Sequence, residues 1–313
     1  MTPAIRRTLA NPATLGFLAA LVLWGATVAL AGGRGAHDTL AVALSFAIFT
    51  VTVGTGQMFV IASGPGNIDL SVPSAMTLAA YLSMDLMGGS NALLPVGLLV
   101  AIGTGLAVGA ANHLLIRALA IPPIIATLAS SFALQSLAMN AGGESTVKPP
   151  PLLADLTVTH ILGVQLLLVL GIAGSAVAQV VIARSIFGRH LLATGQNARA
   201  AALAGVSAGR VRFFAYLICG ALAGLAGFLL AGFTGGAALN MGDTYLMESV
   251  AVAVLGGTSV AGGRANAVGI WGAALFLSLL ATLLNASGVD AGWRLILSGL
   301  TIVAVVAFAG DRG

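Results

Sequence analysis

The chain has 313 residues, of which 58% are hydrophobic and 7% charged, with a net charge of +4 and a mean hydropathy of +1.05. Soluble globular domains carry about 25% charged residues, so this composition excludes a soluble domain. The apolar runs are continuous and lack the two-residue alternation of barrel strands, which disfavours a membrane β-barrel. The 42 glycines among these runs indicate transmembrane helices that pack closely.

The first apolar run covers residues 14–31 and follows Arg6 and Arg7. This pattern is also found in secretory signals, for which Ala29-Leu30-Ala31 would be a cleavage site. The apolar core is longer than the roughly 7–15 residues of a signal peptide. We therefore favour an uncleaved first span.

Nine more apolar runs follow, most of them near the ~20 residues that a helix needs to cross the hydrocarbon core. They cover residues 40–62, 70–88, 92–116, 121–139, 161–183, 213–234, 246–260, 266–286 and 290–309. The prediction is an all-α polytopic transmembrane helix bundle of about ten spans. Residues 1–313 are expected to form a single domain.

The basic residues set the expected orientation. With both termini in the cytoplasm, ten of the thirteen Lys and Arg residues lie inside, and only Arg34, Lys148 and Arg294 lie outside. This bias follows the positive-inside rule. The positive net charge is therefore interpreted as membrane topology, and no nucleic-acid partner is expected. Residues 184–212 become a cytoplasmic loop, and residues 140–160 become a periplasmic loop.

Two spans are short or interrupted. Residues 70–88 contain Pro73 near the start, and residues 246–260 begin near Glu248 and end in a glycine-rich segment. Each is the second member of a quartet of spans, and the two quartets have opposite orientation. Paired weak segments in corresponding halves predict an inverted repeat around a central pathway.

The periplasmic loop contains Glu144, Lys148, Asp155 and the run Pro149-Pro150-Pro151. Such a loop is either a stiff, solvated connector or a landing surface for an external partner. The residues alone leave both interpretations open.

The most distinctive polar stretch is Gly-Asn-Ile-Asp-Leu-Ser-Val-Pro-Ser at residues 66–74. In one interpretation Asp69 or Ser71 caps a helix that has Pro73 in its first turn. In the other, Asn67, Asp69 and Ser71 line or gate a polar pathway, because ionisable groups within a membrane are costly and usually functional.

The second short span offers three more pathway residues. Glu248 either marks a helix start at the outer interface or faces the bundle, where it would contact substrate or a neighbouring helix. Thr258 and Ser259 lie in Gly-Gly-Thr-Ser-Val-Ala-Gly-Gly at residues 256–263. That segment either packs helices tightly or turns the chain at a constriction, where free backbone carbonyls would face a cavity.

The basic segment 184–212 contains five arginines and no acid. Within it, residues 195–205 predict a short helix with Asn197 as N-cap and Gly205 at the C′ position. About two turns are unstable alone in water, so the helix needs a surface to lie against. We expect it to dock on a soluble partner through the following residues: Gly195, Asn197, Arg199, Ala201, Ala202 and Gly205.

The chain carries no motif for chemistry of its own. It has no GxxxxGK[ST] sequence, so an ATP-driven process would need a separate nucleotide-binding subunit. The four histidines are scattered and Cys219 is the only cysteine, so no metal site is expected. No cofactor is expected either, and the chain is not interpreted as an enzyme.

Four stretches resemble motifs of sugar-type ABC importer permeases, the ribose-permease branch of the branched-chain amino acid, sugar and nucleoside permease superfamily. Residues 66–72 resemble its GGIDLSVG signature, and residues 195–205 are similar to its GxNxxAAxxxGI segment. Residues 255–263 resemble LGGTSxxGG, and residues 121–128 resemble IPPFIVTLG. Asn67 and Pro73 replace glycines of the signature, which leaves the transported solute open.

The resemblance implies a permease that dimerises, in the simplest case as a homodimer, around a central pathway in the bacterial inner membrane. A cytoplasmic ATP-binding subunit would dock on residues 195–205, and a periplasmic substrate-binding protein would deliver a monosaccharide or polyol. Transport would proceed by alternating access. The alternative is an ion-coupled secondary transporter of a small polar solute, which requires buried acids that titrate. A membrane enzyme is a third class that no motif supports.

Overall fold

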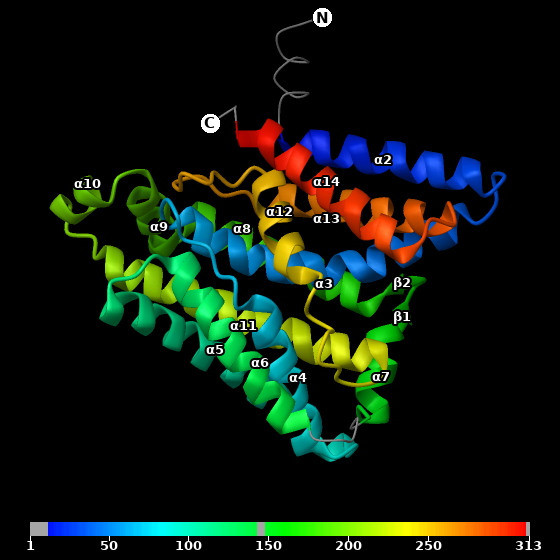
Figure 1. Ribbon diagram of the computed structural model, residues 1–313, viewed down its shortest axis with the longest axis horizontal. Helices are drawn as coiled ribbons and strands as arrows, with labels where there is room; N and C mark the ends of the chain where they lie inside the picture. Colours follow the sequence, from blue (N-terminus) through cyan, green and yellow to red (C-terminus); the bar gives the residue numbers. More distant parts are fainter. Residues whose placement is uncertain (1–11, 143–147, 311–313) are drawn as a thin grey trace, which may run out of the picture.

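Long helices make up most of the computed structural model, which describes residues 12–142 and 148–310 (Figure 1). The first elements are α2 (Pro12–Leu30), α3 (Ala36–Ala62), α4 (Val72–Met87), η1 (Asn91–Leu93), α5 (Leu94–Leu119), α6 (Pro123–Gly142) and α7 (Pro151–Val158). The strands are β1 (His160–Ile161) and β2 (Val164–Gln165). The later helices are α8 (Leu166–Arg184), α9 (Ile186–Gln196), α10 (Ala198–Leu203), α11 (Ala208–Thr234), α12 (Tyr245–Leu255), α13 (Ala267–Ala286) and α14 (Ala291–Gly310).

Seven of the described helices are long and apolar enough to cross a membrane. They include α3 and α11, each of 27 residues. The two segments that were expected to be short are short: α4 has 16 residues and α12 has 11. The prediction of an all-α polytopic membrane protein is confirmed, and the two short helices lie where the sequence placed its interrupted spans.

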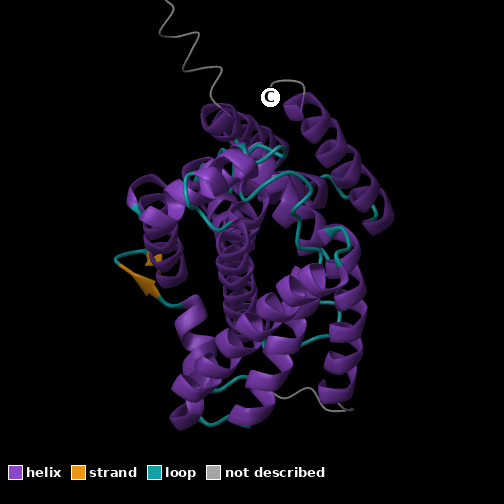
Figure 2. Ribbon diagram, turned by 90° about the vertical axis from the view of Figure 1, so that its left-hand side faces the viewer, coloured by secondary structure: helices purple, strands orange, loops and turns teal. Residues whose placement is uncertain are grey.

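The helices pack in two groups of similar arrangement around α3 and α11, which contact each other. Helix α11 packs on α5 and α4, while α3 packs on α13 and α12. Helix α4 also contacts α6, and α12 contacts α14. Seen from the end that carries α10, the structure is helical nearly throughout, with the two short strands at one edge (Figure 2).

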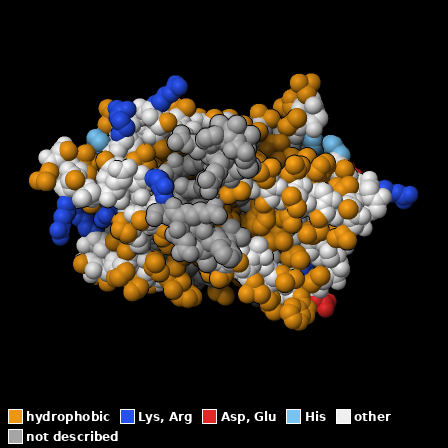
Figure 3. Space-filling view, turned by 90° about the horizontal axis from the view of Figure 1, so that it is seen from above, with side chains coloured by type: hydrophobic (Ala, Val, Ile, Leu, Met, Phe, Trp, Pro, Cys, Tyr) orange, Lys and Arg blue, Asp and Glu red, His pale blue; other side chains and the backbone are white. Residues whose placement is uncertain are grey.

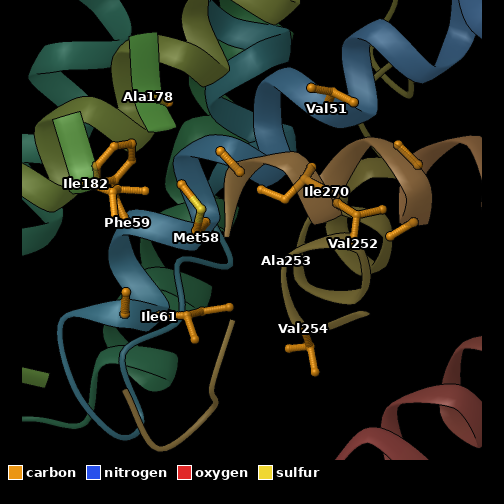
Figure 4. Close-up of a cluster of buried hydrophobic side chains, with 14 of the residues drawn as sticks. Val51, Met58, Phe59, Ile61, Ala178, Ile182, Val252, Ala253, Val254 and Ile270 are labelled. Carbon is orange, nitrogen blue, oxygen red and sulfur yellow. The ribbon is translucent and has the colours of Figure 1, made fainter. Parts of the chain in front are cut away.

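A large apolar cluster joins segments that are far apart in the sequence. Side chains of α3, α8, α12 and α13 point into it, among them Met58, Ile182, Val252 and Ile270 (Figure 4). Helix α12 is too short to cross the bilayer alone, so its burial against this cluster keeps it in place.

Glycines bring α5 and α11 into backbone contact. A Cβ atom added to Gly105 would meet the carbonyl oxygen of Gly220, and one added to Gly224 would meet the carbonyl oxygen of Ala101. Such close approach is how membrane helices gain packing energy without a hydrophobic driving force. The glycine content noted in the sequence therefore has a specific packing role here.

Two segments differ from the expectation. Residues 160–165 form a two-stranded hairpin and the span starts only at Leu166, because Leu162 and Gly163 adopt positive φ angles of 52° and 80° in the turn. Hydropathy missed this turn because its residues are apolar. Residues 186–196 form helix α9, which was expected to be loop.

The described part of the periplasmic loop is more ordered than a plain connector. Residues 151–158 form α7, in which Leu153 is buried against Gly232 of α11. The Leu152 N–H donates a hydrogen bond to Asn91 Oδ1 at 2.9 Å. Glu144 of this loop lies outside the described residues, as do Arg6, Arg7 and Arg312, which supported the topology.

Positive charge gathers toward one end of the molecule. On the face shown in Figure 3, most of the visible Lys and Arg side chains lie on the half that carries α10. The acidic side chain that is visible there lies toward the opposite end. This distribution agrees with the predicted charge asymmetry across the membrane.

We expect Gly105→Ala to lower the free energy of unfolding by about 1–3 kcal/mol, because the new methyl group forces α5 away from the α11 backbone. Thermal melting of the purified chain in detergent measures this loss. Gly103→Ala is the matched control: no atom lies within 4 Å of its added Cβ. Equal melting temperatures for the two variants would refute the close-packing role.

Candidate functional site

A buried polar network surrounds Asp69 in the loop between α3 and α4. The Asp69 side chain is 2% exposed and accepts hydrogen bonds from the Ser71 N–H at 2.9 Å and the Ser71 hydroxyl at 2.7 Å. Asn112 on α5 donates from Nδ2 to Ser71 Oγ at 2.7 Å and to Asp69 Oδ1 at 3.3 Å. The loop itself, through Ser71, and the distant helix α5, through Asn112, thus both hold this carboxylate.

Helix α6 completes the network. The Leu70 N–H donates to Thr127 Oγ1 at 3.0 Å, and the Ser130 hydroxyl donates to Asn112 Oδ1 at 2.6 Å. The stretches 66–72 and 121–128, identified separately in the sequence, therefore meet in space. Asn112 and Ser130 were not predicted; their only signal is an amide and a hydroxyl within apolar helices.

The capping interpretation of this stretch is only partly correct. Ser71 occupies the N-cap position of α4, but its side chain makes no capping hydrogen bond, while Pro73 does lie in the first turn. The only ion pair among residues 12–142 and 148–310 joins His37 to Asp38. In the described structure Asp69 is therefore buried with hydrogen bonds and no ion pair.

Glu248 lies outside the Asp69 network and contacts α3 instead. It lies half-buried in the first turn of α12 and accepts a hydrogen bond from the Thr50 hydroxyl at 2.8 Å. Thr50 lies near the middle of α3, so Glu248 faces a neighbouring helix within the bundle. Just before α12, Gly242 packs against the backbone of Pro73, so the starts of the two short helices lie beside each other.

Thr258 and Ser259 lie in the loop after α12, where three segments meet. The Gly263 N–H donates to the Ala62 carbonyl at 3.0 Å, and Gln196 Nε2 donates to the Gly263 carbonyl at 3.3 Å. The Thr258 hydroxyl is buried without a partner among the described residues. This loop thus connects the end of α3 to the end of α9.

Helix α10 forms where it was predicted. Asn197 Oδ1 accepts the N–H groups of Arg199 and Ala200, both at 3.0 Å. At the other end Gly205 has φ 84°, and the Val206 N–H bonds back to the Ala201 carbonyl at 3.0 Å. Both helix ends are therefore closed by local hydrogen bonds.

The exposed face of α10 is almost entirely apolar. Ala201 is buried against the protein, whereas Arg199 and Ala202 are exposed and Leu203 is 92% exposed. Leu203 was not in the predicted docking set. Gly195, which was, lies buried: its added Cβ would meet the Ala62 carbonyl and the Gly263 N–H. Gly195 therefore packs the segment against the bundle and presents no docking surface.

A cavity of about 560 Å³ opens where the α3–α4 loop, the end of α5 and the starts of α6 and α11 meet. Asn67, one of the predicted pathway residues, lines this cavity. The other lining residues are Pro65, His113, Ile116, Arg117, Pro123, Ser207, Gly209, Arg212 and Tyr216. Asp69, Ser71 and Glu248 are not among them.

Comparison with known proteins identifies the family. The family described as "Branched-chain amino acid transport system / permease component" matches residues 39–306 of the chain. The chain belongs to this family. The matched region extends from α3 into α14 and includes the polar network, the cavity and α10.

Curated relatives agree with this assignment. The autoinducer 2 import system permease protein LsrC of Enterobacter sp. (strain 638) is 30% identical over 98% of this chain and 89% of its own length. LsrC of Escherichia coli K12 is 31% identical over 87% of this chain and 79% of its own. A probable ABC transporter permease protein, y4mJ of Sinorhizobium fredii, is 28% identical over 82% and 76%. No solved structure matches the chain.

The family and the helices together establish a multi-pass protein of the bacterial inner membrane that acts as a transporter permease. The resemblance to ABC importer permeases, inferred from four short motifs, is confirmed. The matched relatives are transporter components and not enzymes.

Thr127→Val is expected to lower the free energy of unfolding by about 1–3 kcal/mol, because it keeps the side-chain shape but leaves the Leu70 N–H without an acceptor. Thermal melting in detergent measures the loss. Ser136→Ala on the same helix serves as control, since that exposed hydroxyl bonds only to its own helix. Identical melting curves would show that the contact between the two motifs adds no stability.

Proposed function

We propose that this chain is the membrane-spanning subunit of an ATP-driven importer, which moves a monosaccharide or related polyol by alternating access. ATP would be hydrolysed by a separate cytoplasmic subunit. The observation that carries this proposal is α10: a capped helix with an apolar exposed face, on the basic end of a chain without a nucleotide-binding motif. The solute class is supported by the motif likeness and by relatives named for the import of autoinducer 2.

Helix α10 would seat in a groove of the ATP-binding subunit. Leu203 is the anchor, since a large apolar side chain with 92% exposure gains most from burial. Ala202 and Arg199 flank it on the exposed surface. Helix-in-groove docking of this kind uses a few apolar side chains on one face.

Movement of α10 would reach the membrane interior through the contacts behind it. Gln196, at the end of α9, bonds to Gly263, and Gly263 bonds to Ala62 at the end of α3. The loop that contains Thr258, Ser259 and Gly263 continues from α12. The backbones of Gly195, Gly263 and Ala62 are in direct contact, with no side chain between them. A displacement of α9 would therefore displace the ends of α12 and α3 as well. Packed helices respond to such pushes by switching between discrete arrangements.

The pathway would lie between the two short helices, whose starts are in contact at Gly242 and Pro73. Asn67, Asp69 and Ser71 stand on one side, and Glu248 stands on the other. Carboxylate, amide and hydroxyl groups suit the many hydroxyls of a sugar or polyol, because they donate and accept hydrogen bonds without requiring a charged substrate.

The two similar helix groups support an inverted repeat, with α3–α6 corresponding to α11–α14. Gly54 of α3 packs against Val252 of α12, as Gly227 of α11 packs against Met76 of α4. On this basis α4 and α12 count as membrane segments, and about ten spans result with both termini in the cytoplasm. A second copy of the chain, a periplasmic substrate-binding protein and the surrounding lipid would complete the assembly.

An ion-coupled secondary transporter is the second candidate, favoured by one observation: Asp69 and Glu248 are carboxylates within the bundle that make no ion pair in the described structure. Proteoliposomes separate the two mechanisms. The importer requires ATP and the ATP-binding subunit for uptake of labelled monosaccharides, whereas an ion-coupled carrier works on a proton or sodium gradient alone.

Leu203→Asp is expected to abolish co-purification of the ATP-binding subunit while the chain stays in the membrane. The substitution places a charge where an apolar groove would close over it. Leu162→Asp is the matched control, because Leu162 is 99% exposed in the β1–β2 turn, away from α10. Retention of the ATP-binding subunit by the Leu203 variant would refute the docking assignment.

Asp69→Asn is expected to reduce uptake about tenfold or more with little change in membrane abundance. The amide keeps the shape and one acceptor oxygen, but it removes the charge that orders Ser71 and Asn112. Uptake is measured with a panel of labelled monosaccharides and polyols, and abundance is measured by immunoblotting of membranes. Disappearance of the variant from the membrane would favour a purely structural role.

A further inference from the structure

The cavity beside Asn67 carries more positive charge than a sugar pathway needs. Arg117 from the last turn of α5 and Arg212 from α11 line it, together with His113. No Asp or Glu is present among the described residues that line it. Two guanidinium groups without a neighbouring acid in the lining favour an anionic ligand over a neutral sugar, because only an anion compensates their charge.

Two polar groups at the cavity are buried and lack a partner. Arg212 Nε and the Tyr216 hydroxyl make no hydrogen bond in the described structure, and Tyr216 is only 1% exposed. Buried donors without an acceptor cost about 1–3 kcal/mol each, so this part of α11 carries polar groups that the described chain does not satisfy. Both donors lie on α11, one helical turn apart.

The surrounding residues hold these donors in position. The Arg212 guanidinium lies against Gly64 at the end of α3, where a Cβ atom would be 3.1 Å from Nη2. The His113 ring packs edge-on against Phe213, with ring centroids 5.5 Å apart. Ser207, the N-cap of α11, also lines the cavity, so the start of that helix faces the same space.

The chemistry that matches this lining is a tetrahedral oxyanion. A phosphate group offers several acceptor oxygens and negative charge, and guanidinium groups bind it through charge-assisted hydrogen bonds. The Asn67 amide, which already bonds to the Gly64 carbonyl, has a second N–H that can donate to a further oxygen. The cavity volume of about 560 Å³ leaves room for more than the phosphate alone.

We propose that this cavity is a binding site for a phosphate-bearing anion on the cytoplasmic side, with Arg212 and Arg117 as its main ligands. The shared chemistry fits two sources, the headgroup of an anionic lipid and a soluble phosphate compound. Ser207 and Gly209 directly follow the α10 segment. An anion bound in the cavity would contact both the start of α11 and the α3–α4 loop. It would therefore stabilise the segment that carries α10, the helix proposed to dock on the ATP-binding subunit.

The test uses the full-length chain in lipid nanodiscs. In discs of phosphatidylcholine alone, calorimetric titration with inorganic phosphate measures soluble-anion binding. In discs that also contain phosphatidylglycerol, native mass spectrometry measures which lipid stays bound to the released chain. Arg212→Gln and Arg117→Gln are compared with Arg210→Gln, a nearby exposed arginine of α11 that does not line the cavity.

We expect bound phosphate or retained phosphatidylglycerol, weakened about tenfold or more by Arg212→Gln and unchanged by Arg210→Gln, because a charged hydrogen bond accounts for a change of that size. Binding of phosphate in phosphatidylcholine discs identifies a soluble ligand. Selective retention of phosphatidylglycerol without phosphate binding identifies a lipid headgroup. Either result supports the site.

Three results overturn it: no binding of either probe, equal weakening by Arg210→Gln, or glucose binding that depends equally on Arg212. The last result would assign the cavity to the solute pathway. Arg212 is half-buried, so a folding defect is possible in its variant. Arg117 is exposed, and Arg117→Gln tests the same site without that risk.

Discussion

The hydrogen bonds that hold Asp69 inside the bundle are the constraint on which the central structure depends. A carboxylate buried in a membrane protein is costly unless its oxygens are bonded. Ser71 and Asn112 supply those bonds, and Asn112 is in turn held by Ser130. As a result, the irregular chain between α3 and α4 is tied to α5 and α6, and α4 starts within the bundle.

A second constraint is the direct contact between backbones. Glycines remove the side chains that would keep α5 from α11 and the 256–266 loop from α9. Contacts of this kind transmit displacement well, because no flexible side chain separates the two backbones. The end of α9, the loop after α12 and the end of α3 are therefore joined by direct contacts. The outer surface of the bundle remains free to meet lipid.

Much of this was predictable from the sequence, for identifiable reasons. Long apolar runs predicted the spanning helices, Pro73 and the segment after Glu248 predicted the short ones, and Asn197 with Gly205 predicted the ends of α10. The hairpin at Leu162 was missed because its residues are apolar, so hydropathy reads them as part of a span. Helix α9 was missed because its basic residues placed it between two spans, where a loop was expected.

The site was less predictable than the fold. Asn112 and Thr127 bond to the Asp69 loop across dozens of residues of sequence, and Ser130 in turn bonds to Asn112. No local sequence pattern predicts such pairing. Gly195 was assigned to a docking surface because it adjoins α10 in sequence, yet its missing side chain serves an internal contact. Leu203 was not in the predicted docking set, which followed the residues of the family motif, and only the structure shows that its side chain is exposed.

The closed ends of α10 have a consequence for assembly. Asn197 and Gly205 hold the helix in its final shape before any partner arrives. Association with another subunit then needs no ordering of disordered chain, and the entropic cost of binding is limited to bringing two rigid bodies together. If α10 docks on a partner as proposed, the interface can form quickly and can separate without unfolding of the helix.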